Sequence, residues 1–125
     1  MRLIACSLSE QQVRDEIKDI TRRLGWLDVK VGEHLMFCRK IMGRKPGEPL
    51  VRIREIEVVS VRREKLSAMT ENLNYGFSEC KREGFANYTP KQFVAFFCHS
   101  HKGCKPSTII TRISALTMAC ATMGS

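Results

Sequence analysis

Apolar residues along this chain fall into short runs that predict alternating strands and short helices. Residues 3–8 form a first apolar run with the length of a buried strand. Ser9 follows as a candidate N-cap, with Gln12 placed three residues later to complete a capping box, and apolar residues then recur at near-helical spacing. The pattern therefore predicts a strand over residues 3–8 and a short helix over residues 10–18.

The middle of the chain favours β-structure. The turn Val31-Gly32-Glu33 leads into an apolar run that predicts a strand over residues 34–41. A basic loop rich in proline and glycine, residues 44–49, connects this strand to a run from Leu50 to Arg63. In that run β-branched residues alternate with arginines up to Arg54, and the alternation blurs after Glu57. It is either two strands or one long strand with a bulge, with β-branched side chains toward the core and arginines outward.

Helical patterns return in the second half of the chain. The segment Asn72-Leu73-Asn74-Tyr75-Gly76 predicts a break, and residues 78–82 predict a short helix that ends with a glycine C-cap at Glu83-Gly84-Phe85. Thr89-Pro90 then opens a better helix, with threonine as N-cap and several phenylalanines on its apolar face. Residues 107–113 predict a further strand.

Short strands and two or three short helices indicate an α+β fold, a small mixed β-barrel flanked by short helices. At 125 residues the chain is long enough for one core, and we assign residues 1–113 to a single domain. Residues 114–125 are small and apolar and contain no carboxylate, which is atypical for a domain end. This segment is a frame-altered tail, a remnant of cloning or a packed terminal strand.

The excess of basic over acidic residues indicates a negatively charged binding partner. A net charge of +8 and a pI near 9.5 favour a polyanion, such as nucleic acid or a nucleotide. The alternative is a basic protein whose charge serves only solubility. The basic residues of the central section either line a groove for RNA or form the solvated face of a sheet; they are Arg39, Lys40, Arg44, Lys45, Arg52, Arg54, Arg62 and Arg63.

Three further features concern location and metals. The chain has no apolar run long enough to span a bilayer and no export signal at its start. Its six cysteines lack regular spacing, which favours reduced thiols in a cytoplasmic protein. The loop with Cys98, His99, His101 and Cys104 has residue types that bind zinc, but not the pair-and-pair spacing of a structural site. We expect an exposed, positively charged binding loop there and no metal.

Candidate chemistry gathers in residues 18–23. Lys18 stands three residues before Thr21, so the two can meet across a helical turn or where a helix runs into a strand. They are a candidate base and nucleophile, and Arg22 and Arg23 beside them can hold an anion. The alternative is structural: Lys18 forms an ion pair with a distant glutamate and Thr21 borders a strand.

Several segments together resemble the ASCH domain, a member of the PUA-like β-barrel superfamily. They are Lys18-x-x-Thr21-x-Arg23, the Val31-Gly32-Glu33 turn, the valine-rich central strands, and Glu83-Gly84-Phe85 followed by Thr89-Pro90-x-x-Phe93. The resemblance covers residues 2–112 and implies a PUA-like barrel. Residues 21–26, Thr-Arg-Arg-Leu-Gly-Trp, and residues 101–104, His-Lys-Gly-Cys, are similar to small phage-borne ASCH proteins.

A related branch of ASCH proteins comprises bacterial amidohydrolases that deacetylate 4-acetylcytidine with a lysine, a threonine and a distant glutamate. Lys18 and Thr21 match the first two at the same spacing, and Glu83 matches the third by its local setting. A longer central section places Glu83 further from Lys18 than in those enzymes. The resemblance implies that Thr21 is the nucleophile and Lys18 its base, without a cofactor. Glu83 then either orients Lys18 or protonates the departing amine.

The base role requires a neutral lysine, and burial together with nearby arginines would lower the pKa of Lys18. For ligand binding we assign Arg22 and Arg23 to an anion, Trp26 and Phe85 to stacking on a base, and Arg52 and Arg54 to RNA. A non-catalytic RNA-binding module and a ribonuclease are the alternatives, because other ASCH proteins are thought to bind or cleave RNA. The expected partner is a nucleoside, a nucleotide or RNA in each case.

Overall fold

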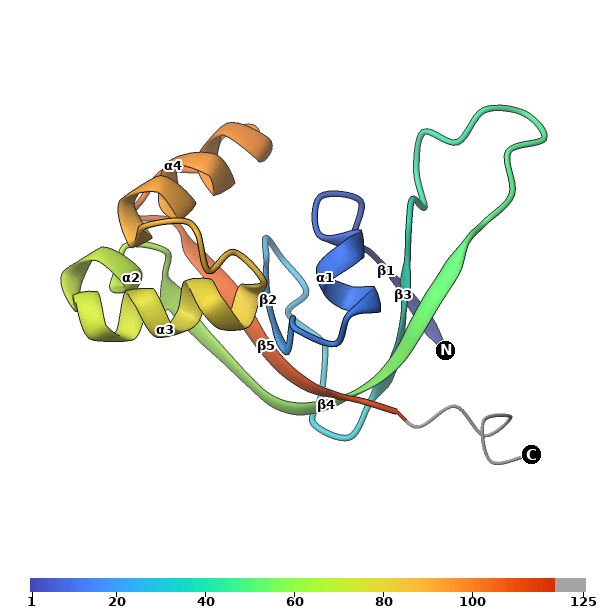
Figure 1. Ribbon diagram of the computed structural model, residues 1–125, viewed down its shortest axis with the longest axis horizontal. Coiled ribbons are helices and arrows are strands. Elements are labelled where there is room, and N and C mark those ends of the chain that lie inside the picture. The colour runs from blue at the N-terminus through green and yellow to red at the C-terminus, as the bar shows by residue number, and fades with distance from the viewer. Residues whose placement is uncertain (119–125) are drawn as a thin grey trace.

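The computed structural model describes residues 1–118, which form one curled, five-stranded mixed sheet with short helices against it (Figure 1). The sheet order is β1-β3-β4-β5-β2, with β1 and β3 parallel and all other neighbours antiparallel. The elements are β1 Arg2–Ala5, α1 Glu10–Arg14, β2 Ile20–Arg23, β3 His34–Cys38, β4 Arg52–Lys65, α2 Ala68–Glu71, α3 Leu73–Glu83, α4 Pro90–Ser100 and β5 Ile109–Thr117. The predicted α+β fold with a curled, barrel-like sheet is confirmed.

Strand β4 organises the sheet because it is long enough to pair with two different partners. Its first part pairs with β3, and the rest pairs with β5 through a register shift between Val58 and Ser60. The central run is therefore one strand with a bulge, the second of the two forms expected from the sequence. Loop residues 39–51 between β3 and β4 extend away from the body as an arm (Figure 1).

Two apolar cores flank the middle of the sheet. One packs α1 against β1, β3, β4 and β5 and is built from Ile4, Cys6, Val13, Val29, Leu35, Phe37, Ile56, Val58 and Ile113. The other packs α2, α3 and α4 against the ends of β4 and β5 and is built from Leu66, Met69, Cys80, Phe93, Val94, Phe97 and Ile110. Strand β2 lies at the edge of the sheet beside β5, and in the ribbon it runs between α1 and α3 (Figure 1).

Helix α1 is shorter than predicted. It ends at Arg14, because Glu16 adopts a left-handed backbone with φ of 58° that no α-helix continues through. Ser9 flanks the helix but makes no side-chain cap bond, so the predicted capping box with Gln12 is wrong. The chain then crosses the end of α3, where Asp19 N donates to the Arg82 carbonyl at 2.9 Å. Lys18 consequently stands at the bend before β2 rather than on a helix.

Helix α3 is longer than predicted. Asn72 accepts a bond from Tyr75 N and caps the helix, so the segment predicted as a break is the first turn of α3. Its other end is as predicted: Gly84, at φ 93°, is the left-handed C-cap. A Cβ at Gly84 would also lie 2.7 Å from Gln12 Cβ, so glycine permits the close approach that brings Glu83 to the segment before β2.

The remaining elements follow the sequence pattern more closely. Thr89 and Gln92 form a complete capping box at the start of α4, with Pro90 in the first turn, as Thr89-Pro90 predicted. Strand β5 runs to Thr117, so residues 114–117 are part of the sheet, whereas residues 119–125 of the atypical tail lie outside the described residues. Within residues 1–118 no helix is both long and apolar enough to cross a membrane.

Candidate active site

A pocket of about 200 Å³ opens between the two cores, beside β2. Its polar side carries Lys18, Thr21, Arg22 and Arg23 from the β2 segment and Glu83 from the end of α3. Its apolar side is aromatic and consists of Phe85, Phe93, Phe96 and Phe97, with His101 at the end of α4 and residues 5–9 at the rim. The three residues predicted to act together thus line one cavity.

Lys18 and Glu83 make direct contact although they are 65 positions apart. Lys18 Nζ donates to Glu83 Oε1 at 2.7 Å and to the Glu83 carbonyl at 3.0 Å, and both side chains are less than 5% exposed. The Lys18 ammonium also lies 5.9 Å from the centroid of the Phe85 ring. Burial lowers the pKa of Lys18, the Glu83 carboxylate opposes that shift, and Arg23 and Arg22 add to it.

Thr21 lines the pocket but does not bond to Lys18. Thr21 Oγ1 accepts from Arg23 Nε at 3.0 Å, and the described hydrogen bonds of Lys18 Nζ all go to Glu83. A hydroxyl oxygen that accepts from a guanidinium keeps its own proton free for another acceptor. The same contact stabilises negative charge on that oxygen. The arrangement favours ionisation of Thr21 once a base approaches it.

Arg23 retains unused capacity to bind an anion. Its Nη2 donates to the Ala5 carbonyl at 2.6 Å and its Nε to Thr21, and it makes no ion pair within residues 1–118. Burial lowers the pKa of Arg23, while the charge of Glu83 partly offsets this. An arginine at a pocket wall without a carboxylate partner gives the cavity a local excess of positive charge.

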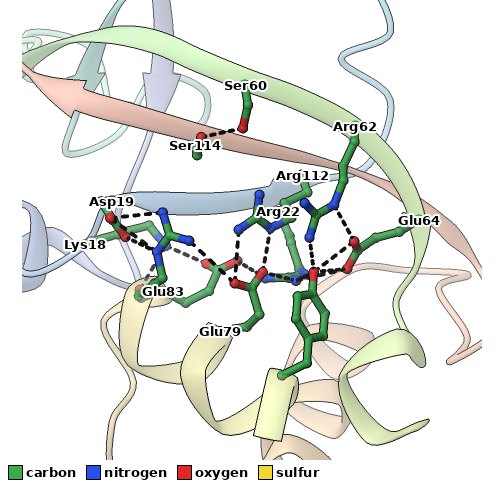
Figure 2. A network of polar contacts seen from close by, with 12 residues as sticks. Lys18, Asp19, Arg22, Ser60, Arg62, Glu64, Glu79, Glu83, Arg112 and Ser114 are labelled. Carbon is green, nitrogen blue, oxygen red and sulfur yellow. Dashed lines mark hydrogen bonds and ion pairs between the residues drawn. The ribbon is translucent and has the colours of Figure 1, made fainter. Parts of the chain in front are cut away.

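Arg22 points away from the solvent into a chain of buried charges (Figure 2). Its side chain is fully buried and contacts three carboxylates: Glu83 at 3.1 Å, Glu79 at 2.6 Å and Glu64 at 3.1 Å. Glu79 also accepts from Arg112 Nε at 2.5 Å. The expected anion-binding role of Arg22 is thus occupied by protein carboxylates. Glu79 was not among the site residues predicted from the sequence, although its position four residues before Glu83 places both on one face of α3.

The other predicted ligand residues lie apart from the pocket, with one exception. Phe85 lines it and packs against Phe93 and Phe96 at centroid distances of 5.8 and 5.5 Å. Trp26 is not part of the lining; its ring lies 4.7 Å under the Arg2 guanidinium and packs on the first core. Arg52 and Arg54 belong to β4 at the base of the extended arm.

The histidine and cysteine residues at the end of α4 lie in two different environments. His101 stacks on Phe97 with centroids 4.0 Å apart and borders the pocket, whereas Cys98 and Cys104 face each other with sulfurs 3.9 Å apart. Among the residues described, no group of three or more His, Cys, Asp or Glu side chains is arranged to hold a metal ion. All five cysteines of that part are free thiols.

The ionic chain predicts how stability depends on acid. Its arginine contacts outweigh burial and lower the pKa of Glu79 from 4.5 to about 2. Because the folded-state pKa is the lower one, this stabilisation is complete above pH 4.5 and is lost as the pH falls toward 2. We expect the free energy of unfolding in urea to fall by roughly 3 kcal/mol more over this range than in Glu79→Gln. Equal acid losses in the two proteins would contradict the assignment.

Two solved structures share this fold. A hypothetical protein, PH0355, has a TM-score of 0.63 at 13% identity, over 94% of this chain and 100% of that one. An ASCH domain from Lactobacillus crispatus has a TM-score of 0.54 at 12% identity, over 93% of this chain and 79% of that one. No protein-family model and no curated protein matches the sequence. The likenesses establish the fold.

Proposed function

We propose that this chain, which has the fold of an ASCH domain, is an amidohydrolase that removes an acyl group from a modified cytidine. The observation that supports this most directly is the convergence of Lys18, Thr21 and Glu83 in one pocket, with Lys18 Nζ 2.7 Å from Glu83 Oε1. The candidate nucleophile Thr21 lines this pocket, and Arg23 Nε donates to its oxygen at 3.0 Å.

The proposed reaction has two halves. Lys18 takes the hydroxyl proton of Thr21 as the oxygen attacks the acyl carbon, and Arg23 stabilises the negative charge that develops. The bond from the acyl carbon to the cytosine amine then breaks, and the Lys18 ammonium returns its proton to the departing nitrogen. Lys18 then takes a proton from a water molecule as its oxygen attacks the acyl carbon, the bond from that carbon to Thr21 Oγ1 breaks, and the Lys18 ammonium returns the proton to Thr21 as the carboxylic acid leaves.

The geometry favours one of the two roles considered for Glu83. Its Oε1 accepts from Lys18 and its Oε2 accepts from Arg22 at 3.1 Å, so both oxygens already face cations. A carboxylate whose two oxygens both accept from cationic donors is poorly placed to pass a proton to a leaving amine. We therefore assign Glu83 to orienting Lys18 and assign protonation of the leaving amine to Lys18 itself.

The pocket suits a flat, partly apolar ligand. Its aromatic side presents Phe85, Phe93, Phe96 and Phe97 opposite the polar groups, and nucleobases stack on such surfaces. A cavity of about 200 Å³ limits the buried portion to a small molecule. A nucleobase with a short acyl group fits this description, with the ribose at the rim.

The direct test is turnover by the purified protein. We expect 4-acetylcytidine to be converted to cytidine and acetate, which chromatography resolves. A panel of other acylated nucleosides and simple N-acyl amines establishes which part of the substrate is recognised. If the protein hydrolyses none of the panel, the amidohydrolase assignment is wrong.

A second candidate function, RNA binding without catalysis, is favoured by the basic arm. Arg52 and Arg54 make no ion pair with any described carboxylate, whereas Arg39 pairs with Glu10 and Arg62 with Glu64. Unpaired cations at the start of β4, where the arm of residues 39–51 joins the sheet, can reach a phosphate backbone. Arg52 and Arg54 are therefore the available set, free to contact RNA, whereas Arg39 and Arg62 are held by carboxylates of the protein.

Neutralising the available set tests this candidate. We expect Arg52→Gln/Arg54→Gln to weaken binding of single-stranded RNA and to reduce the slope of log affinity against log salt by about 1.4, since two phosphate contacts are lost. Fluorescence anisotropy at several salt concentrations measures both. Arg39→Gln/Arg62→Gln, at the two arginines that pair with Glu10 and Glu64, is the matched control and leaves the slope unchanged. An unchanged slope for Arg52→Gln/Arg54→Gln contradicts RNA binding through these two arginines. In a separate test, RNA that stays intact during prolonged incubation with the protein excludes a ribonuclease.

A further inference from the structure

Arg22 is the centre of a buried chain of charges that begins at the pocket and continues along α3 (Figure 2). Lys18 contacts Oε1 of Glu83 at 2.7 Å, and Arg22 Nη1 contacts Oε2 of the same carboxylate at 3.1 Å. Arg22 Nη2 continues to Glu79 at 2.6 Å, and Glu79 accepts from Arg112. Glu83 is thus shared between two cations, and Glu79 is shared between Arg22, Arg112 and, at 4.0 Å, Arg82.

Because Glu83 contacts both Lys18 and Arg22, its negative charge stabilises the Lys18 ammonium less than it would stabilise a lysine paired with it alone. One carboxylate cannot compensate two cations as fully as it compensates one, because the two cations also repel each other. An arginine keeps its proton throughout the pH range in which proteins are folded, whereas a buried lysine can lose it. Arg22 therefore stays positively charged and bound to Glu83 throughout that pH range. Of the two cations that contact Glu83, Lys18 is the one that can lose its charge.

The surroundings of Arg22 fix its guanidinium in the orientation that contacts Glu83. Its side chain is fully buried, and three carboxylates and Tyr75 surround its two terminal nitrogens. Its Nε is the one buried side-chain nitrogen or oxygen among the described residues that has no hydrogen-bond partner. The guanidinium is oriented by Glu83, Glu79 and Glu64 even though this leaves a buried donor unpaired.

We propose that Arg22 and Glu79 are positioning residues for Lys18: Arg22 holds the second oxygen of Glu83 so that Lys18 has only a shared counter-ion, and Glu79 fixes Arg22 in that place. The proposal deepens the function given above, since it rests on Lys18 as the base. It adds that the charge state of Lys18 is set by Arg22 and Glu79, whose side chains are buried. It also accounts for Arg22, which the pattern Lys18-x-x-Thr21-x-Arg23 leaves unassigned.

The groups that face Lys18 are few and come from each element around it. They are Glu83 from α3, Arg22 and Arg23 from β2, Cys6 from the segment after β1, and His101, which lines the same pocket from the end of α4. The pKa of Cys6 is raised to about 11 by burial, so its thiol is neutral near neutral pH. Glu83 and the two arginines are then the charges that decide the state of Lys18, and Glu79 acts through Arg22.

The proposal predicts shifts of opposite sign for two substitutions. Removing the Arg22 charge leaves Glu83 to Lys18 alone, so Arg22→Gln raises the pKa of Lys18. Removing the Glu79 charge leaves Arg22 more dependent on Glu83, so Glu79→Gln lowers it. Each shift is expected to be about one unit or more, as for other charges at this separation. Arg62→Gln, at the exposed end of the network and in contact with Glu64 rather than Glu83, is the matched control.

The measurement is an NMR titration of protein labelled with ¹³C at the lysine side chains, without any substrate. Lys18→Arg identifies the resonance of Lys18, and amide spectra verify that each variant is folded. Shifts in the same direction for the two variants, or no shift in either, overturn the proposal. If Arg22→Gln does not fold, Glu79→Gln decides: a lower pKa supports the proposal, and an unchanged or raised pKa overturns it.

The outcome is separable from that of the proposed function. Opposite shifts without turnover of any acylated nucleoside would refute the amidohydrolase and leave the charge-sharing intact. Turnover without the shifts would refute the charge-sharing alone. Where both hold, the acidic limb of the rate profile moves to higher pH in Arg22→Gln and to lower pH in Glu79→Gln.

Discussion

Replacing Lys18 by alanine is expected to lower kcat/KM for 4-acetylcytidine by a factor of about a thousand or more, and replacing Thr21 by valine is expected to do the same. Loss of the base leaves the threonine hydroxyl too weak an acid to attack, and loss of the hydroxyl removes the nucleophile. Because the two act in a single step, the double variant should be no worse than either single one. Steady-state rates of the three proteins measure this directly.

Conservative and remote substitutions provide the controls. Thr21→Ser keeps a hydroxyl and should retain measurable turnover, whereas Lys30→Ala alters an exposed lysine and should leave the rate unchanged. Thr21→Val with full activity would show that Lys18 activates water directly rather than a threonine. Full activity of both Lys18→Ala and Thr21→Val would contradict the site.

The pH dependence follows from the same assignment. Burial lowers the pKa of Lys18 below its ordinary value of 10.5. A base is active when it is unprotonated, so kcat/KM should rise with pH and level off at a pH below 10.5. A rate that instead falls as the pH rises through this range would assign the essential group to an acid.

The sequence predicted those parts of the site that depend on local rules. Lys18 stands at the bend before β2 and Thr21 lies three residues later within that strand, and Glu83 is marked by the glycine C-cap that follows it. The helix that opens with Thr89-Pro90 was equally predictable, because an N-cap threonine and a proline at the first helical position are adjacent in the chain. Each of these features requires only neighbours in the chain.

The partners of Arg22 required the tertiary structure. Its contacts with Glu64, Glu79 and Glu83 span 42, 57 and 61 positions, and no local pattern pairs them. Trp26 was expected at the ligand because tryptophan often stacks on bases, but tertiary packing places it under Arg2. The early end of α1 has the same origin, since the chain must leave the helix for Lys18 to reach the end of α3.

Gly76 gives the clearest case of a local rule overridden by packing. Glycine contributed to the predicted break at residues 72–76, yet Gly76 lies inside α3. A Cβ there would lie 2.0 Å from the Met69 carbonyl oxygen and 2.6 Å from Pro90 Cγ. The glycine is therefore present because α3 approaches both α2 and the start of α4 too closely for any side chain.

Gly76→Ala should consequently destabilise the protein, although alanine is the better helix former by about 1 kcal/mol. Overpacking costs about 1–3 kcal/mol where side chains can yield. Here the nearest atom belongs to the backbone, so we expect a net loss at or above about 2 kcal/mol. Urea unfolding at pH 7 measures it. Ser78→Ala, at an exposed position two residues further along α3, is the matched control and should be neutral or slightly stabilising.

Because α3 carries both Glu79 and Glu83, Gly76→Ala should also disturb the pocket. A variant as stable as the parent would mean that α2 and α3 can separate without loss, and the packing that brings Glu83 to Lys18 would then be looser than the structure shows.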